Sequence, residues 1–208
     1  MARQAIREFR ALSYACHIGT TGADPKSVEW NEKMADDFSR SLIQFNKRIR
    51  ALAYVSSWCM GENESEAMWR IYGSSGASVA LVTSYGRLRD SLPNDNSLYV
   101  GTINYFDFER RVVDLGNTLW PLMHKRHEFE HESEARIVRC DLNMPPEANL
   151  DELPPVHFLH WKPEDHVEKI VVSPYTPAWQ SETIKESLRR ISPTLADRLM
   201  DSEMANIP

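Results

Sequence analysis

The residues with the clearest chemical potential form one dense run of charge, from Lys125 to Val138. Within this run Glu130, Glu132, Glu134 and Arg136 occupy every second position. Alternate side chains of an extended chain share one face, so the three carboxylates and the guanidinium would lie together. Crowded carboxylates repel one another, which raises the pKa of at least one of them. Such a group can serve acid–base chemistry or stabilise a cationic transition state, and the plainer alternative is a solvated or ion-paired strand edge.

Length, composition and charge describe an ordinary globular protein. The chain has 208 residues, which fits a single domain over residues 1–208 with a flexible tail at 193–208. The formal net charge of −6 disfavours a nucleic-acid partner, although local basic clusters keep it an alternative. Three widely spaced cysteines without a paired motif favour a reducing compartment and no structural zinc. No signal peptide or long apolar run is present, so we expect a cytoplasmic protein without a membrane partner.

Hydrophobic spacing and turn residues outline the elements that must position the charged run. Apolar residues from Met34 to Leu52 recur at intervals of three and four, which predicts a long amphipathic helix over residues 26–52. Because predicted strands often follow one another directly, we expect an α+β fold with a mixed, largely antiparallel sheet and flanking helices. Further helices are expected at 65–72, 84–92, 179–191 and from near Thr118 through the basic segment, and strands at 53–59, 77–83, 98–106, 132–140, 156–161 and 167–172.

Three separate stretches carry a resemblance to a known family. They are Tyr54–Cys59 with the following Glu64–Ala80, then Lys125–Arg136, and finally Ile170–Trp179. In order and spacing they resemble the bacterial family called domain of unknown function 2971, over about residues 50–192. Members of that family usually begin with an additional first strand, to which Ser13–Ile18 is the one candidate here.

The layout also has a weaker resemblance to the ADP-ribosyltransferases. Those enzymes typically place an Arg or His on the first strand, a serine on a following strand, and a Glu-x-Glu pair on a later one. The matching positions here are His17, then Ser56 or Ser57, then the glutamates of the charged run. The resemblance implies an ADP-ribosyltransferase-like fold, NAD as a substrate, a macromolecular acceptor and a role in a bacterial or phage conflict system.

The residue types suit that chemistry. Breaking the bond between nicotinamide and ribose builds positive charge on the ribose, and a fixed carboxylate in a dry site stabilises this charge. We favour Glu132 for this role because it is central in the run, with a serine hydroxyl positioning the glutamate. Arg126 or Arg136 would bind the pyrophosphate, since arginine grips phosphate with two hydrogen bonds. Tyr72 and Trp69 are candidates to stack on nicotinamide, although their spacing is more typical of core residues.

A metal-dependent nuclease is the rival enzymatic interpretation. Nucleases of the restriction type pair an Asp with a later Glu-x-Lys, and Asp107 with Glu109 followed by Glu134 and Arg136 imitates that pattern. Arginine at the lysine position weakens the match, because the lysine acts partly through a tunable pKa that arginine lacks.

A non-catalytic module that binds or inhibits another protein on the same fold is the alternative outside enzymes. The charged run would then be an ion-paired scaffold. Trp120, Trp161 and Trp179 would be the residues that anchor a protein partner.

Overall fold

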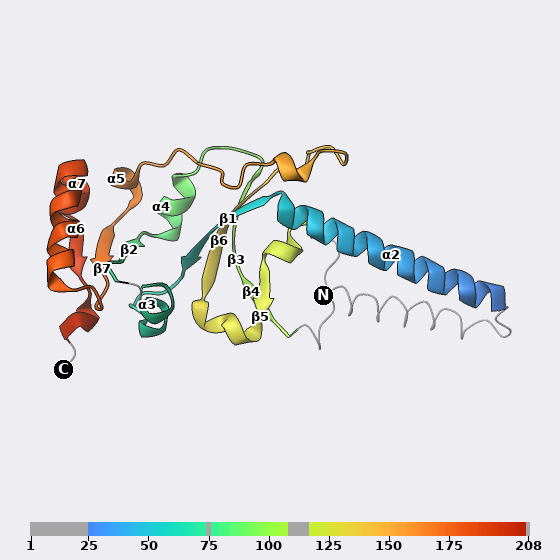
Figure 1. Ribbon diagram of the computed structural model, residues 1–208, viewed down its shortest axis with the longest axis horizontal. Helices are drawn as coiled ribbons and strands as arrows, with labels where there is room; N and C mark the ends of the chain where they lie inside the picture. The colour runs from blue at the N-terminus through green and yellow to red at the C-terminus, as the bar shows by residue number, and fades with distance from the viewer. Residues whose placement is uncertain (1–24, 74–75, 108–116, 207–208) are drawn as a thin grey trace. The chain divides into compact units, whose positions relative to one another are not determined.

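The computed structural model describes residues 25–73, 76–107 and 117–206 (Figure 1). His17 and Glu109 therefore lie outside the described residues. Helices and small sheets of mixed strand direction confirm the α+β class. The chain divides into two compact units, one formed by residues 1–59 and 96–157 and the other by 60–95 and 158–208. A single domain over 1–208 remains a prediction. No described helix is long and apolar enough to cross a membrane.

The main sheet of the first unit has three antiparallel strands in the order β1-β6-β3 (Figure 1). Arg136 of the central strand lies opposite Ser57 on one side and Gly101 on the other. A Cβ at Gly101 would lie 2.9 Å from the Met123 methyl carbon, so a larger residue here would require the Met123 side chain to shift. The strands are β1 (Ala53–Cys59), β3 (Leu98–Thr102) and β6 (Glu134–Cys140).

The first unit also contains a two-stranded parallel sheet, which forms where the sequence predicted the end of a longer strand and a helix. The expected strand 98–106 is interrupted at Ile103, and its last part is β4 (Asn104–Phe106). The helix expected through the basic segment is wrong, because β5 (His124–Arg126) pairs with β4 in parallel. The 3-10 turns η1 (Trp120–Leu122) and η2 (His127–Glu132) flank β5. The strand partner thus overrides a local helical preference.

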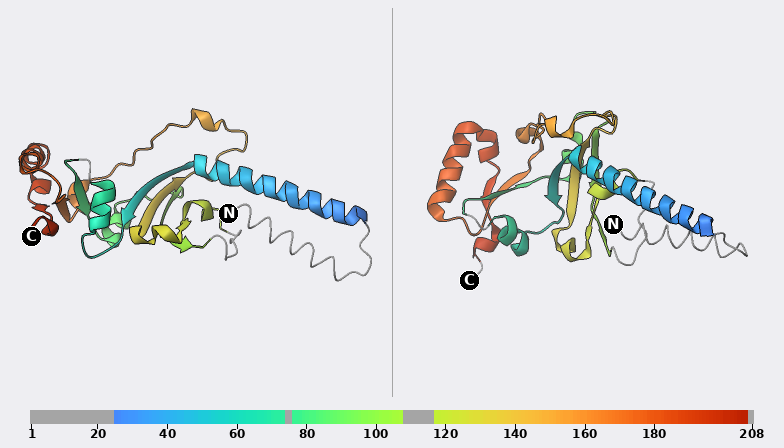
Figure 2. Two further views of the ribbon diagram at one scale, coloured as in Figure 1. Left: turned by 60° about the horizontal axis from the view of Figure 1, so that its bottom comes forward. Right: turned by 45° about the vertical axis from the view of Figure 1, so that its right-hand side comes forward.

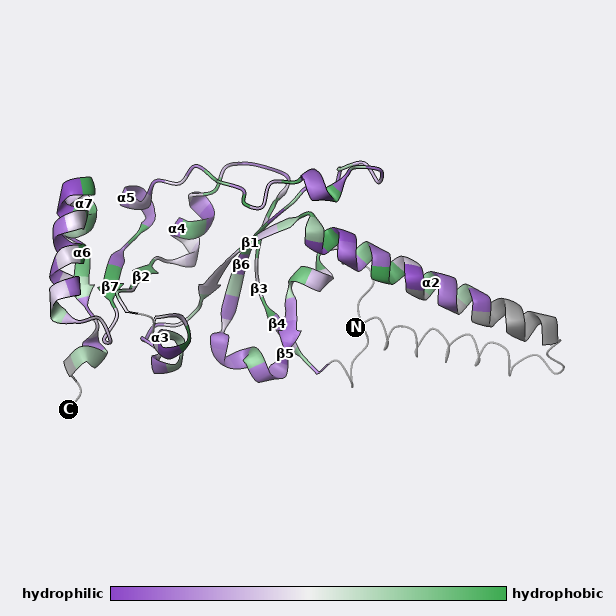
Figure 3. Ribbon diagram, viewed as in Figure 1, coloured by the Kyte–Doolittle hydropathy of each residue, from purple (hydrophilic) through white to green (hydrophobic). Residues whose placement is uncertain are grey.

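The long helix α2 (Pro25–Ala51) is confirmed, and among its described side chains only that of Ile49, in the last turn, is a buried member of the core cluster. Figures 1 and 2 show α2 running away from the strands, and Figure 3 shows apolar residues at the end that meets them. The amphipathic pattern predicts that the stripe Met34, Phe38, Phe45 and Ile49 packs on the sheet. Ile49 does so, but Met34 and Phe45 are 45% and 42% exposed, so the prediction is wrong for these two residues. The core cluster comprises Ile49, Leu52, Leu122, Val138 and Cys140.

The second unit contains another three-stranded sheet in the order β2-β7-β8, antiparallel and then parallel. No strand forms over the described residues 156–161, which corrects the expectation there. The continuous apolar run of β2 predicts a buried strand, but most of its residues are exposed. The strands are β2 (Val79–Val82), β7 (Lys169–Val172) and β8 (Leu199–Asp201); the helices are α3 (Glu66–Tyr72), α4 (Tyr85–Asp90), α5 (Pro163–His166), α6 (Ala178–Ile191), α7 (Pro193–Ala196) and η4 (Glu203–Asn206).

A single carboxylate fixes the C-terminal segment that the sequence predicted to be a flexible tail. Glu64 accepts hydrogen bonds from Trp69 Nε1 at 2.8 Å, from the Ser202 hydroxyl at 2.6 Å and from the Glu203 amide at 2.9 Å. Burial would raise the pKa of Glu64, but these hydrogen bonds lower it overall. The expectation of disorder is therefore wrong through residue 206, because β8 and η4 are held in place.

Candidate functional site

The charged run is divided between two elements rather than extended throughout. Glu130 and Glu132 lie in η2, and Ser133 ends this turn with a φ of 40°. The strand β6 begins only at Glu134, so only Glu134 and Arg136 share a strand face as the alternation predicted. The positive φ at Ser133 redirects the chain, which breaks the two-residue period that the sequence pattern suggested.

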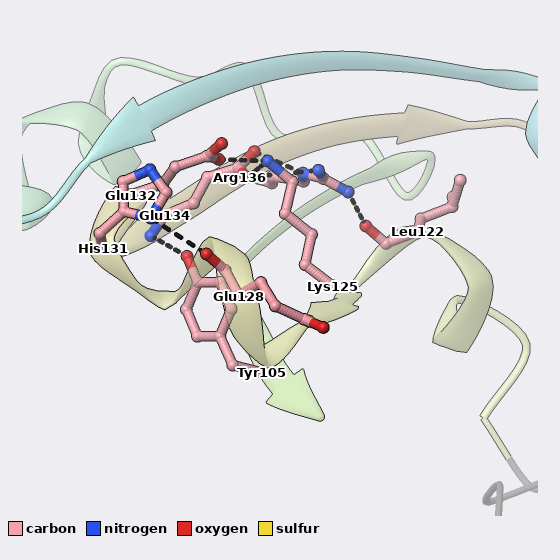
Figure 4. A network of polar contacts seen from close by, with 8 residues as sticks. All are labelled: Tyr105, Leu122, Lys125, Glu128, His131, Glu132, Glu134 and Arg136. Atoms are coloured by element: carbon pink, nitrogen blue, oxygen red, sulfur yellow. Dashed lines mark hydrogen bonds and ion pairs between the residues drawn. The ribbon is translucent and has the colours of Figure 1, made fainter. Parts of the chain in front are cut away.

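The structure brings two of the three glutamates together around a lysine (Figure 4). Lys125 Nζ forms ion pairs with Glu132 Oε2 and, at 2.7 Å, with Glu134 Oε2. Arg136 Nε pairs with Glu134 Oε1 at 2.6 Å, and Arg136 also donates a hydrogen bond to the Leu122 carbonyl. Two cations thus balance two carboxylates, so the group pairs opposite charges instead of crowding three negative ones.

Glu134 is the anchor of this group. Its side chain is only 4% exposed, and burial alone would raise its pKa. Hydrogen bonds from Arg136, Lys125 and Ser57 outweigh burial and lower the pKa of Glu134 from 4.5 to about 2. Glu134 is consequently ionised at neutral pH, which suits a fixed negative charge and does not suit a proton carrier.

Strand alternation decides between the two candidate serines. Ser57 lies opposite Arg136, on the strand face that also carries Glu134, and its hydroxyl helps to lower the pKa of that carboxyl, so one serine and one glutamate do converge. Ser56 belongs to the other face of β1, where its hydroxyl accepts a hydrogen bond from Trp58 Nε1 at 3.1 Å. The structure therefore brings Ser57, and not Ser56, to the glutamate pair.

The depressed pKa of Glu134 predicts how stability depends on pH. Folding favours its ionised form, so the contribution is complete above pH 4.5 and is lost as the pH falls toward about 2. A fall of this size corresponds to about 3 kcal/mol in the free energy of unfolding. We expect denaturant unfolding at pH 5, 4, 3 and 2 to show this loss in the wild type and a correspondingly flatter profile in Glu134→Gln. Equal slopes for both proteins would contradict the assignment.

Three other candidate residues differ in their surroundings. Glu130 is exposed, and its carboxylate oxygen lies 3.3 Å from His127 Nδ1, apart from the lysine-centred group. Arg126 is also exposed, with its guanidinium carbon 5.6 Å from the centre of the Phe129 ring. Arg136 donates hydrogen bonds to Glu134 and to the Leu122 carbonyl. These contacts do not support the expectation that its guanidinium binds a phosphate.

The two aromatic candidates belong to the second unit. Trp69 is 8% exposed and donates its ring N–H to Glu64, in agreement with the core interpretation of this residue. Tyr72 is 64% exposed. A stacking role for either ring remains a prediction, as does the role of His17.

The structure adds to the site three residues that the sequence had not indicated as part of it. Lys125 lay in the charged run, and its neighbouring acidic residues were the signal for an ion pair. The Tyr105 hydroxyl accepts a hydrogen bond from the Glu134 amide at 2.8 Å. Burial and the nearby carboxylates of Glu134 and Glu132 raise the pKa of Tyr105. The amide hydrogen bond and Lys125 oppose this rise. Partial burial of its thiol raises the pKa of the exposed Cys59, and Glu132 adds to this effect. The strand pairing that places Tyr105 has no local sequence signal.

Comparison with known proteins found no matching family model, no matching curated protein and no matching solved structure. Within the described part of the chain, no group of three or more His, Cys, Asp or Glu residues is placed to hold a metal ion.

Proposed function

We propose that the chain is an ADP-ribosyltransferase-like enzyme that uses NAD as a substrate and modifies a macromolecular acceptor. The observation that carries this proposal is the convergence of Ser57, Glu134 and Glu132 around Lys125. It supplies a serine hydroxyl, a carboxylate that is ionised at neutral pH and a second carboxylate beside it. These are the groups that the chemistry needs, held in one place by strands and an adjoining turn.

In the proposed reaction, the bond between ribose C1′ and the nicotinamide nitrogen breaks. Its electron pair leaves with the nitrogen, which gives neutral nicotinamide and a positively charged ribose. A nucleophile of the acceptor forms the new bond to C1′ and releases its proton to water. A carboxylate held in a largely water-free site stabilises the positive charge as it develops, which lowers the barrier.

Glu132 is the better candidate than Glu134 for contact with the ribose. Both oxygens of Glu134 are occupied, one by Arg136 and the other by Lys125. Among the described residues Glu132 is held through Oε2 only, and its side chain is 10% exposed against 4% for Glu134. We assign Glu134 the role of anchor and Glu132 the role of catalytic carboxylate.

Arg126 is our candidate for the pyrophosphate. It adjoins Lys125 in sequence, is exposed, and makes no ion pair with any described residue. Its planar guanidinium can bind two phosphate oxygens at once. Arg136 is assigned to the support of Glu134 instead, because its donors already face protein acceptors.

The proposal is tested by incubating the purified chain with NAD that carries a label in the ADP-ribose part, with and without a bacterial lysate. We expect release of nicotinamide and transfer of label to a protein or nucleic acid. A thermal shift gives an independent reading, since NAD at a hundredfold excess over its Kd stabilises the fold by about 2.7 kcal/mol. If neither nicotinamide release nor a shift occurs at millimolar NAD, the proposal is wrong.

A protein-binding module is the second candidate function, because one expected anchor is available to a partner. Trp179, at the start of α6, is 69% exposed, and exposed tryptophans often dominate binding energy. Trp120 is not such an anchor, since it is buried and stacks on His124 at 4.0 Å between ring centres. We expect Trp179→Ala to abolish partner capture if this function holds and to leave NAD cleavage unchanged if the first one does.

The nuclease interpretation has weaker support. A magnesium ion would need the carboxylate oxygens of Glu134, which bind Lys125 and Arg136.

A further inference from the structure

The ribbon formed by β4 and β5 presents two side chains to the glutamate pair. Tyr105 of β4 and Lys125 of β5 are partners in the strand register, so they lie side by side (Figure 4). Lys125 reaches the two carboxylates, while the Tyr105 hydroxyl accepts a hydrogen bond from the backbone amide of Glu134 at 2.8 Å. One residue of this pair therefore holds the side chains, and its neighbour holds the backbone that carries them.

The amide held by Tyr105 follows directly after the unusual backbone of Ser133. A φ of 40° is uncommon outside glycine and costs on the order of 1 kcal/mol or more. On one side of this bend the Ser133 amide donates to the Glu130 carbonyl at 3.0 Å, which closes the end of η2. On the other side Glu134 is fixed twice, by its carbonyl to the Ile103 amide at 2.8 Å and by its amide to Tyr105.

Fixing the chain at this bend determines where Glu132 lies. Glu132 precedes the bend and Glu134 follows it, yet both carboxylates meet the same Lys125 nitrogen. A regular strand would also place them on one face, but η2 ends between them. Because an unpaired buried amide is costly, loss of the Tyr105 hydroxyl would favour a different path for this segment.

We propose that Tyr105 is a positioning residue that holds the Glu132–Glu134 segment so that both carboxylates meet Lys125. Its consequence for catalysis rests on the proposed function, whereas its consequence for the position of Glu132 does not. Tyr105 acts through the backbone and need not contact the substrate.

The pKa of the Cys59 thiol reports the position of Glu132 independently of enzymatic activity. It is exposed, lies opposite Glu134 in the strand register, and its thiol pKa is raised by partial burial and by the Glu132 carboxylate. When Glu132 moves away, the second effect weakens and the thiol pKa falls. The rate of alkylation of the Cys59 peptide as a function of pH, followed by mass spectrometry, measures this change.

The test compares Tyr105→Phe with Tyr99→Phe, a matched control on β3 whose ring packs against the core cluster. Both substitutions remove one hydroxyl and keep the ring. For Tyr105→Phe we expect kcat for NAD cleavage to fall about tenfold with KM changed by less than about twofold. We also expect the Cys59 pKa to fall, while Tyr99→Phe changes neither quantity.

Two results would overturn the assignment of Tyr105. One is a folded Tyr105→Phe chain with an unchanged Cys59 pKa, whatever its activity, because Glu132 would then not have moved. Another is a Tyr105→Phe chain that fails to fold, which would give the hydroxyl a purely structural role. If the wild type does not cleave NAD, the proposed function fails alone, and the Cys59 titration still decides on Tyr105.

Discussion

Glu132→Gln should lower kcat for NAD cleavage by about a hundredfold or more and leave the chain folded. Glutamine keeps the shape of the side chain but removes the negative charge that faces the developing cation of the ribose. Loss of one such electrostatic contribution typically costs 10²- to 10³-fold in rate, here about a hundredfold at least. The measurement is nicotinamide release at saturating NAD, with circular dichroism as the check on folding.

Glu130→Gln is the matched control for this substitution. Glu130 lies two residues away in the same 3-10 turn, but it is exposed and its carboxylate contacts His127 instead of Lys125. We expect its kcat to stay within about twofold of the wild-type value. Equal losses in both variants, or full activity in Glu132→Gln, would contradict the role assigned to Glu132.

Lys125→Met should lower the free energy of unfolding by about 3–5 kcal/mol, the cost typical of removing one partner of a buried ion pair. Lys125 is the cation shared by Glu132 and Glu134, and all three side chains are a quarter exposed or less. Without it, Arg136 is left to balance two carboxylates, and of these two it pairs only with Glu134. Urea unfolding at pH 7 measures the loss.

Two further variants distinguish charge imbalance from loss of packing. In Lys125→Met with Glu132→Gln, one cation again faces one carboxylate, so we expect part of the stability to return. Lys47→Met, at an exposed position of α2, should change stability by no more than about 0.5 kcal/mol. If Lys125→Met is as mild as Lys47→Met, the ion pairs contribute little to the fold.

Elements with strong local signals were predictable from the sequence. The spacing of apolar residues gave α2, and Thr176-Pro177 marked the start of α6, because these signals act within a few residues. Ser65 and Ser84 cap α3 and α4 through side-chain hydrogen bonds, and serine is a common residue at this position.

Features that depend on contacts distant in sequence were not predictable. The basic segment forms β5 because β4, about twenty residues earlier, offers a parallel partner. The strand β8 forms because β7 and Glu64 hold it, although its own sequence suggested a disordered tail. Alternation of charge suggested one face for all three glutamates, whereas the 3-10 turn η2 separates Glu130 from the pair.

In the candidate site, too, the residue types were predictable from the sequence, but the contacts that depend on strand register were not. The serine and glutamate types were identified from the sequence, and alternation along β1 required that only one serine face the glutamates. That Ser57 is this serine follows only from the register of β1 with β6. The role of Tyr105 likewise depends on the register of β4 with β5, which the sequence does not reveal.

Hydrogen–deuterium exchange of the wild-type chain with and without NAD tests most directly whether the lysine-centred group binds this molecule. The account predicts slower exchange at millimolar NAD in the peptides that cover residues 125–136 and 54–59. The same peptides in Glu132→Gln should also be protected, since that variant loses charge stabilisation and keeps the binding surface. Unchanged exchange in these peptides, or protection confined to the second unit around Trp179, would contradict the account.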